Sequence, residues 1–323
     1  MHEEYDYRTD AVWQQLVREG REKLGGPALW TYQSSHDPWL TNSYYLETER
    51  GVLLFDTQTF LSSAEELLSD IRRNTSGQLY GIVITHAHPD HVSGNEFFRR
   101  QFPNAFIATA AGVATELKRT AHLRTATQHR EYGDEVPASL SPGFYPDLVF
   151  EGSLSLRFED VTVELTEHGP SEAEAHVTAF IPEHRALISG DLIQNRQHYF
   201  MGEMQFQNWY QQVERLEALE PAMILTGHQG VAGPEMLAET KRWIATFLGL
   251  MAAHVGCGND PQDISKLDDD GRRAVINGLK ASFPGWHDEI MTADGETAME
   301  YCLKGRDSAT EEAALAVARA MGN

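Results

Sequence analysis

The sequence predicts a layered α/β fold with helices at its C-terminal end, and three observations predict it. Between residues 42 and 109, apolar strand-like runs alternate with amphipathic helix-like segments, which is typical of α/β layering. Between residues 153 and 191, short alternating runs indicate antiparallel strands, and from about residue 236 onward the pattern is helical. The chain has 323 residues, of which 41% are hydrophobic, so a large core can form.

The first half predicts strands that end at polar residues. A surface helix is expected at 7–24, and 42–58 predicts two strands joined at the charged turn 49–51, the second of which ends at Asp56. A helix is expected at 62–73, where Ser62 or Ser63 precedes glutamates and provides a start signal. The remaining predicted elements of this half are a buried strand at 79–85, a short helix at 94–102 and a strand at 105–109.

The second half also predicts strands that end at polar residues. Strands are expected at 153–168, 176–182, 186–191 and 222–228, with a helix at 208–219 before the last of them. The runs VLLFDT and ALISGD are both apolar strands that end in an aspartate, which would suit a molecule made of two similar halves. The tail predicts helices at 271–283 and 311–322 after a break at 256–263.

Charge and composition limit the classes of partner. The net charge is -22, from 48 acidic and 26 basic residues, and such a surface repels nucleic acid. The two cysteines, Cys257 and Cys302, form no paired metal motif. The N-terminus lacks an apolar segment, and the most apolar run, 247–255, is too short to cross a bilayer. We therefore expect a cytoplasmic protein that acts on a small molecule, with neither nucleic acid nor membrane as partner.

A cluster of metal-binding side chains follows the predicted strand at 79–85. The stretch THAHPDHVSG places His86, His88, Asp90 and His91 within six positions. The turn after a buried strand is a rigid support, and ligands bind beyond the C-terminal ends of strands. His86 and His88 can point the same way, while Asp90 and His91 can turn to an adjacent position, so the motif predicts two neighbouring metal ions.

Later strands supply further acidic and imidazole residues. Asp191 ends one strand, His228 ends another, and the loop HGPSEAEAH at 168–176 precedes a third. HAHPDH followed by strands ending in SGD and TGH resembles the metallo-β-lactamase superfamily, from about residue 40 to about residue 232 in order and spacing. Asp56 matches the family's first aspartate, which is usually structural.

The resemblance implies a four-layer αββα sandwich that carries two metals along one edge. We expect a catalytic domain at 1–245 with a lid-like insertion at about 112–148, and a helical C-terminal extension at 246–323. Amphipathic helices in that extension would suit a homodimer or packing onto the sandwich equally well.

One ligand position departs from the usual family pattern. Most members carry a histidine ahead of the strand that begins near residue 176, and here that position holds Glu172. Members that resemble alkyl sulfatases carry a glutamate there with an acidic residue 19 positions later, and Asp191 lies at that distance. We predict Glu172 as the ligand, with His168 as the alternative and His176 as a supporting residue.

The resemblance then implies a complete ligand set and a reaction. His86, His88 and Glu172 would hold the first metal; Asp90, His91 and His228 would hold the second; Asp191 would bridge them. These nitrogen and oxygen ligands suit two divalent ions, with zinc expected and iron or manganese as alternatives. The expected enzyme is a hydrolase that uses a metal-bound hydroxide on a sulfate ester, lactone, thioester or phosphoester. Asp90 would also be catalytic, by orienting the water and passing on its proton.

Two segments are candidate substrate contacts. The basic segment 118–130 contains Arg119 and Arg124, whose guanidinium groups recognise anions, although a solvated helix face would look the same. The aromatic segment 195–212 offers His198, Tyr199 and Trp209 as a pocket wall, although core packing or a surface position would explain them too.

Two other functions compete with hydrolysis. An iron-dependent redox member of the superfamily, resembling sulfur dioxygenases, would keep the same histidines. A non-catalytic metal-binding module would use the same scaffold, but all seven expected ligand positions are filled, which favours an enzyme.

Overall fold

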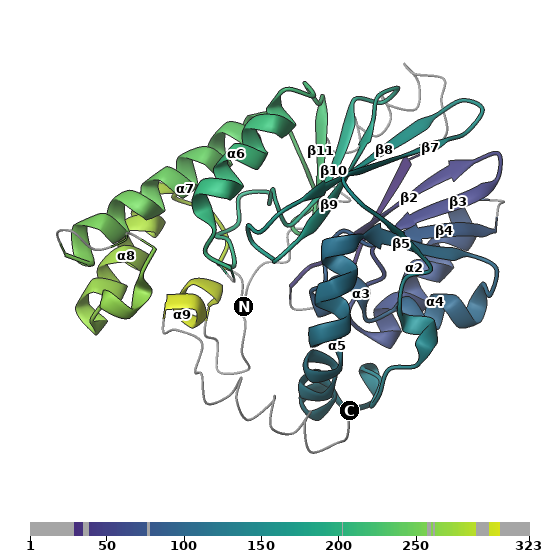
Figure 1. Cartoon of the computed structure of the whole chain (residues 1–323), viewed down its shortest axis with the longest axis horizontal. Helices are drawn as coiled ribbons and strands as arrows, with labels where there is room; N and C mark the ends of the chain where they lie inside the picture. Colours follow the sequence, from purple (N-terminus) through teal and green to yellow (C-terminus); the bar gives the residue numbers. More distant parts are fainter. Residues whose placement is uncertain are drawn as a thin grey trace.

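The computed structural model describes residues 29–34, 39–75, 78–201, 203–256, 260, 262–288 and 297–303. Two six-stranded sheets lie face to face at the centre of the molecule, and helices cover the outer side of each (Figure 1). This arrangement confirms the predicted four-layer αββα sandwich. The helices predicted at 7–24 and 311–322 lie outside the described residues, as does Cys257.

The first sheet has the strand order β1-β2-β3-β4-β5-β6. Its strands are β1 (Leu29–Gln33), β2 (Asn42–Thr48), β3 (Gly51–Phe55), β4 (Leu79–Val83), β5 (Phe106–Ala110) and β6 (Leu148–Phe150). The first two pairings are antiparallel and the other three are parallel. The run GVLLF of β3 is buried throughout, as a strand with both faces covered requires.

Helices cover the outer face of this sheet. They are α2 (Leu61–Asn74), α3 (Pro89–Val92), α4 (Asn95–Gln101) and α5 (Ala111–Tyr132), with 3₁₀ turns at Gly133–Glu135 and Pro142–Phe144. The predicted start of α2 is wrong by two or three residues: Phe60, rather than Ser62 or Ser63, is the N-cap, and the Ser63 hydroxyl is buried against the Ser34 hydroxyl at 2.7 Å. The serines therefore lie inside the first turn, where Ser63 packs rather than caps.

The second sheet has the order β12-β11-β10-β9-β8-β7. Its strands are β7 (Ser153–Arg157), β8 (Thr162–His168), β9 (His176–Ile181), β10 (Ala186–Gly190), β11 (Met223–Thr226) and β12 (Val231–Ala232). β10 and β11 are parallel, and the other pairings are antiparallel. The parallel pair β3–β4 of the first sheet has its counterpart in β10–β11, which is the likeness between halves that the two aspartate-ending strands predicted.

The remaining helices form the fourth layer and its continuation. α6 (Phe206–Glu217) and α7 (Glu235–His254) lie on the second sheet, and α8 (Asp269–Ser282) and α9 (Ala298–Leu303) continue beyond them (Figure 1). A 3₁₀ turn, Ile264–Lys266, precedes α8, whose first turn is capped by the Asp268 carboxylate accepting from the Gly271 amide. None of the helices in the described residues has both the length and the apolar character of a membrane span.

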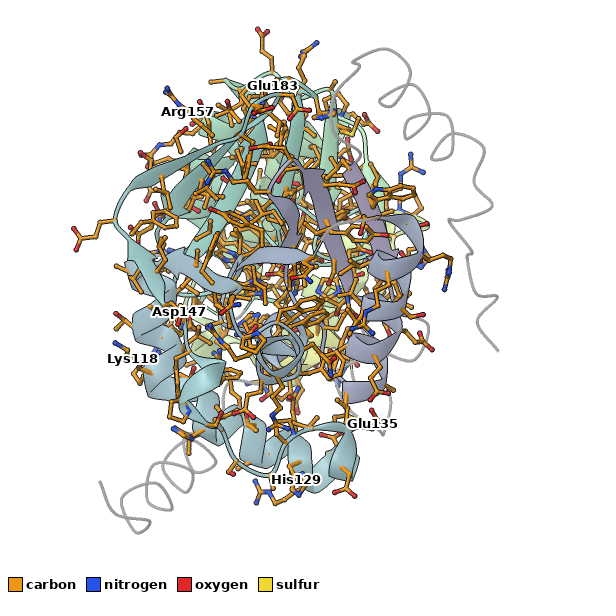
Figure 2. The ribbon with its side chains drawn as sticks, turned by 90° about the vertical axis from the view of Figure 1, so that its right-hand side faces the viewer. Lys118, His129, Glu135, Asp147, Arg157 and Glu183 are labelled. Carbon is orange, nitrogen blue, oxygen red and sulfur yellow. The ribbon has the colours of Figure 1, made fainter. Side chains whose placement is uncertain are left out.

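The two sheets are joined at the end where the metal-binding motif lies. The backbone amide of Asn42 donates to the Gly227 carbonyl at 2.7 Å, and the Tyr44 hydroxyl donates to the Thr226 carbonyl at 2.7 Å. The Val177 amide donates to the Thr85 carbonyl at 2.6 Å, which ties β9 to the loop after β4. These bonds bring the carboxyl ends of β3, β4, β10 and β11 to one edge. Arg157 and Glu183 lie at the other end of the molecule from His129 (Figure 2).

Candidate metal centre

Asp56 organises the loop that carries the histidine motif. It follows β3 with a φ of 60°, and its Oδ1 accepts from the Thr85 amide at 2.8 Å. Its Oδ2 accepts from the Thr85 hydroxyl at 2.7 Å and lies 2.7 Å from Nδ1 of His91. One carboxylate therefore fixes the start of the loop and one of its histidines.

The same contacts set which nitrogens face the centre. Because the Thr85 hydroxyl donates to Asp56, its oxygen accepts from Nδ1 of His86 at 3.0 Å, and His91 donates through Nδ1 to Asp56. Nδ1 of His228 donates to the Trp39 carbonyl at 2.7 Å. All three rings consequently present Nε2 lone pairs, which is how metal-binding histidines are usually oriented.

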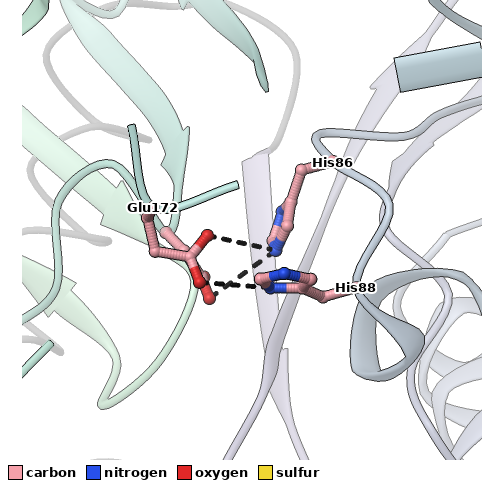
Figure 3. A group of neighbouring side chains, drawn as sticks. His86, His88 and Glu172 are labelled. Atoms are coloured by element: carbon pink, nitrogen blue, oxygen red, sulfur yellow. Dashed lines mark ion pairs between the residues drawn. The ribbon is translucent and has the colours of Figure 1, made fainter. Parts of the chain in front are cut away.

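Glu172 faces His86 and His88 in a first group of side chains (Figure 3). Nδ1 of His88 lies 3.1 Å from Oε1 of Glu172, and Nε2 of His86 lies 3.9 Å from Oε2. Asp191 completes the group, with its Oδ2 at 3.7 Å from Nε2 of His86. The four side chains offer atoms that all lie within 4.8 Å of one another, so a single cation could contact all of them.

Asp191 also belongs to a second group, with Asp90, His91 and His228. Nε2 of His228 lies 3.1 Å from Oδ2 of Asp191, and Nε2 of His91 lies 3.4 Å from its Oδ1. Oδ2 of Asp90 lies 3.0 Å from Nε2 of His91 and accepts from the Thr41 hydroxyl at 3.2 Å. The shared aspartate places the two groups side by side.

Several buried atoms at this centre fit metal ions. Within the described part of the chain, Nε2 of His86, Nε2 of His91, both oxygens of Glu172 and Oδ1 of Asp191 make no hydrogen bond. Nε2 of His91 directs its lone pair at carboxylate oxygens. This arrangement needs a proton or a cation between the nitrogen and the oxygens. Oxygen and nitrogen donors of this kind suit zinc, iron or manganese, so the residues present fit the metals that the resemblance implies.

The electrostatics of the centre reflect crowded carboxylates. Burial, together with the charges of Asp191 and Asp90, raises the pKa of Glu172 well above its usual value. Burial alone would also raise the pKa of Asp90, but His91 and His228 lower it to about 2. Burial lowers the pKa of His88 to about 4, with help from Arg124. His88 is therefore neutral at pH 7, as a metal ligand must be.

The loop that carries Glu172 is held by α6 and by β9. The side-chain amide of Asn208 donates to the Pro170 carbonyl at 2.6 Å, and the side-chain amide of the buried Gln212 donates to the Gly169 carbonyl at 3.1 Å. At the other end of the loop, Nε2 of His176 accepts from the Ala173 amide at 3.0 Å. The supporting role predicted for His176 agrees with this contact.

His168, the alternative to Glu172, lies outside both groups. Its Nε2 shares a hydrogen bond of 2.8 Å with the Thr178 hydroxyl on the neighbouring strand. Burial and the charge of Arg215 lower its pKa to about 4. The geometry thus favours Glu172.

The two arginines predicted to contact substrate lie on α5 and reach different partners. Arg119 forms an ion pair with Glu174, two residues beyond Glu172, and its side chain is 53% exposed. Arg124 donates to the Ala87 carbonyl and to the Glu116 carboxylate, each at 2.9 Å. The segment 112–148 contains all of α5 except its first residue and connects the paired strands β5 and β6, and its action as a lid stays a prediction.

For His198, Tyr199 and Trp209, predicted as an aromatic pocket wall, burial favours the alternative of core packing. Tyr199 and Trp209 are fully buried in the core under α6 and α7, where the Trp209 indole donates to the Leu192 carbonyl at 3.0 Å. His198 is 1% exposed, and its Nδ1 accepts from the Trp243 indole at 3.1 Å. These side chains pack the second half of the sandwich. The sequence could not distinguish the two roles, because an amphipathic helix and a pocket wall share one sequence pattern.

Trp209→Phe should destabilise the protein without weakening substrate binding. The change leaves the Leu192 carbonyl without its buried donor. We therefore expect the free energy of unfolding of the metal-free protein, measured in urea, to fall by about 2 kcal/mol. The KM for any ester that the protein hydrolyses should be unchanged. Tyr210→Phe, at the partly buried neighbour, is the control and should change neither quantity. A raised KM at full stability in Trp209→Phe would restore the pocket-wall interpretation.

Sequence reasoning missed two contacts that shape the centre. Thr85 precedes the first histidine and could have been suspected from that position alone. The Trp39 carbonyl that orients His228 comes from a distant segment. The Phe200 ring, 5.5 Å from the His88 ring, lies in the aromatic segment 195–212 that the sequence already indicated. A backbone carbonyl leaves no mark in a sequence pattern, so such contacts need a structure.

The fold and this edge define an αββα protein with a candidate metal centre built from both sheets. The family model of the Metallo-beta-lactamase superfamily matches residues 36–228, more than half of the chain. The chain belongs to the metallo-beta-lactamase superfamily, as the motif predicted.

Two curated relatives are distant in sequence. The linear primary-alkylsulfatase of Pseudomonas sp. (strain ATCC 19151) is 24% identical over 230 residues, which cover 61% of this chain and 43% of that enzyme. The metallo-beta-lactamase type 2 of Bacillus cereus is 21% identical over 155 residues, which cover 48% of this chain and 52% of that enzyme. The chain thus spans about half or less of the length of these relatives.

Solved structures share the fold. A metallo-beta-lactamase from Pontibacter korlensis aligns with a TM-score of 0.52 and 18% identity, covering 68% of this chain and 95% of that one. A metallo-beta-lactamase family protein from Thermus thermophilus aligns with a TM-score of 0.55 and 18% identity, covering 71% of this chain and 82% of that one.

Proposed function

We propose that the chain is a dinuclear metal-dependent hydrolase of small anionic esters. The observation that supports this most strongly is the pair of side-chain groups that share Asp191 and contain buried lone pairs without hydrogen bonds. The distant alkylsulfatase relative supports an ester substrate, with a sulfate ester ahead of a phosphoester, lactone or thioester.

The ligand assignment follows the two groups. His86, His88 and Glu172 would hold the first ion, Asp90, His91 and His228 the second, and Asp191 both. When bound, two divalent ions, expected to be zinc, supply a water of lowered pKa and polarise the bond under attack.

Asp90 would orient the attacking water. With a pKa of about 2 its carboxyl stays ionised, so it can accept a hydrogen bond from a water and hold that water's proton only briefly. The Thr41 hydroxyl, which donates to Oδ2 of Asp90, keeps the carboxylate turned towards His91 and His228.

The charge of the centre favours an anion. Three carboxylates and two divalent ions leave one net positive charge among the ligands when the four histidines are neutral and the bound water has not yet lost its proton. A sulfate or phosphate ester would meet this charge inside a protein whose overall net charge is -22.

Arg119→Ala should weaken the binding of charged substrates alone. Its exposed guanidinium beside the Glu172 loop would contribute attraction to an anion, so we expect KM for p-nitrophenyl sulfate to rise about two- to fivefold. The KM for neutral p-nitrophenyl acetate should not change. Lys118→Ala removes the same charge from the preceding residue, on the outer surface of α5, and is the matched control (Figure 2). An equal rise in KM for both esters would contradict a role in anion attraction.

The proposed function is tested by metal removal and replacement. Protein treated with a chelator and dialysed should lose hydrolysis of aryl sulfate, aryl phosphate, lactone and thioester probes, and added zinc should restore it. Activity that survives stoichiometric metal removal would refute the proposal. Native iron together with oxygen consumption on a thiol persulfide, and no hydrolysis, would indicate the redox alternative instead.

A further inference from the structure

α5 carries a partly buried ion pair beside the candidate metal centre. Glu116 is 1% exposed, and its Oε1 accepts from Nη2 of Arg124, eight residues further along the helix, at 2.9 Å. The other oxygen of Glu116 is buried and makes no hydrogen bond within the described residues. Burying the Glu116 carboxylate has a desolvation cost that Arg124, with its side chain 26% exposed, offsets only in part, so the pair calls for a reason other than stability.

The second arm of Arg124 supplies that reason. Its Nη1 donates to the carbonyl of Ala87 at 2.9 Å. Ala87 is fully buried and stands between His86 and His88 in the chain. The guanidinium therefore links α5 to the peptide that joins these two histidines.

His88 has particular need of such a link. His86, His91 and His228 each have Nδ1 fixed by a hydrogen bond, to Thr85, Asp56 and the Trp39 carbonyl respectively. In His88, Nδ1 faces Glu172, and the ring nitrogen that remains has no hydrogen bond among the described residues. Its ring also lies edge-to-face with the rings of His86 and Phe200, at centroid distances of 4.7 Å and 5.5 Å. The backbone at Ala87 thus determines where the His88 ring lies.

We propose that Arg124 is a positioning residue for the first metal position, with Glu116 as its counter-ion. This rests on the proposed function, because it assigns His88 to a bound ion. The role replaces the substrate contact predicted for Arg124, since both arms of its guanidinium are engaged by protein acceptors and its charge is balanced by Glu116. Arg124 acts through the Ala87 carbonyl and touches no reacting atom.

The test measures Co²⁺ affinity at each position separately. The His228→Ala background leaves the first group intact, and the His88→Ala background leaves the second intact. In the first background, adding Arg124→Met should weaken Co²⁺ binding about 10–100-fold, the usual effect of losing a partner that orients a ligand. In the second background the same change should leave Co²⁺ affinity unaltered. The visible spectrum of the bound Co²⁺ should change in the first background alone.

Three further variants sharpen the result. Arg124→Lys, whose ammonium can keep one of the two partners, should give an intermediate loss at the first position and guards against misfolding of the methionine variant. Glu116→Gln keeps an acceptor for Arg124 and should retain most of the affinity. Arg130→Met, on the exposed end of the same helix, is the matched control and should alter neither position.

The outcomes separate this inference from the function on which it rests. If the parent protein binds no stoichiometric Co²⁺, the proposed function itself fails. If the parent binds two ions and Arg124→Met weakens neither, or weakens both equally, only the positioning role is overturned. Loss confined to the first position, partly rescued in Arg124→Lys, is the result that the positioning role requires.

Discussion

Asp191→Asn should abolish hydrolysis and leave at most one bound metal ion per chain. Asp191 is the side chain that the two groups share: its Oδ2 lies near His86 and His228, and its Oδ1 lies near His91. Asparagine keeps the size but removes the charge and replaces one oxygen by an amide nitrogen that cannot bind metal. We expect kcat/KM to fall by at least ~1000-fold, more than the 10–100-fold loss typical of partners outside the ligand set.

Metal content and folding should be measured together for this variant. Metal per chain is determined by plasma mass spectrometry, and the circular dichroism spectrum should match that of the parent protein. Asp269→Asn makes the same change at an exposed position on α8 and should retain both ions and full activity. Two ions at parental affinity in folded Asp191→Asn would remove Asp191 from the bridging role.

Glu172→Gln should remove one ion and spare the other. Glu172 is fully buried with both oxygens free of hydrogen bonds among the described residues, and it faces His86 and His88 but not His228. A neutral amide offers one weak oxygen donor in place of a carboxylate, so the first position should lose its ion. The second position, formed by Asp90, His91 and His228, should keep its ion. Hydrolysis should fall by at least ~100-fold, because the water would lose one of the two ions that activate it.

His168→Gln is the comparison that decides between the two candidate ligands. Glutamine can maintain a hydrogen bond to Thr178 across β8 and β9, so the fold should survive the change. We expect two bound ions and near-parental activity in this variant. Loss of an ion from His168→Gln, with two retained in Glu172→Gln, would transfer the ligand role to His168.

The sequence was sufficient for those features that depend on strand ends. His86, His88, Asp90 and His91 follow one buried strand directly, and Asp191 and His228 each follow another. Parallel strands bring their carboxyl ends to one edge of a sheet. The alternation of apolar runs and polar ends was therefore enough to predict that these side chains lie together. Glu172 came from the resemblance, because its loop position has no periodicity.

Features that depend on packing between distant elements were not predictable in this way. Trp209 and Tyr199 occupy the core, although Trp209 on an amphipathic helix and Tyr199 on the preceding loop could have lined a pocket. Arg124 belongs to a basic run in the sequence, but its helix turns it inward, onto a carbonyl 37 residues away in the chain. Hydrophobic periodicity identifies which face is buried and does not identify what that face contacts.

Native mass spectrometry of the folded protein tests the central claim most directly. The account predicts that the folded chain carries the additional mass of two divalent metal ions, returns to the sequence mass in chelator, and regains two ions when zinc is added. A folded chain that remains at its sequence mass in the presence of excess zinc, iron or manganese would contradict it.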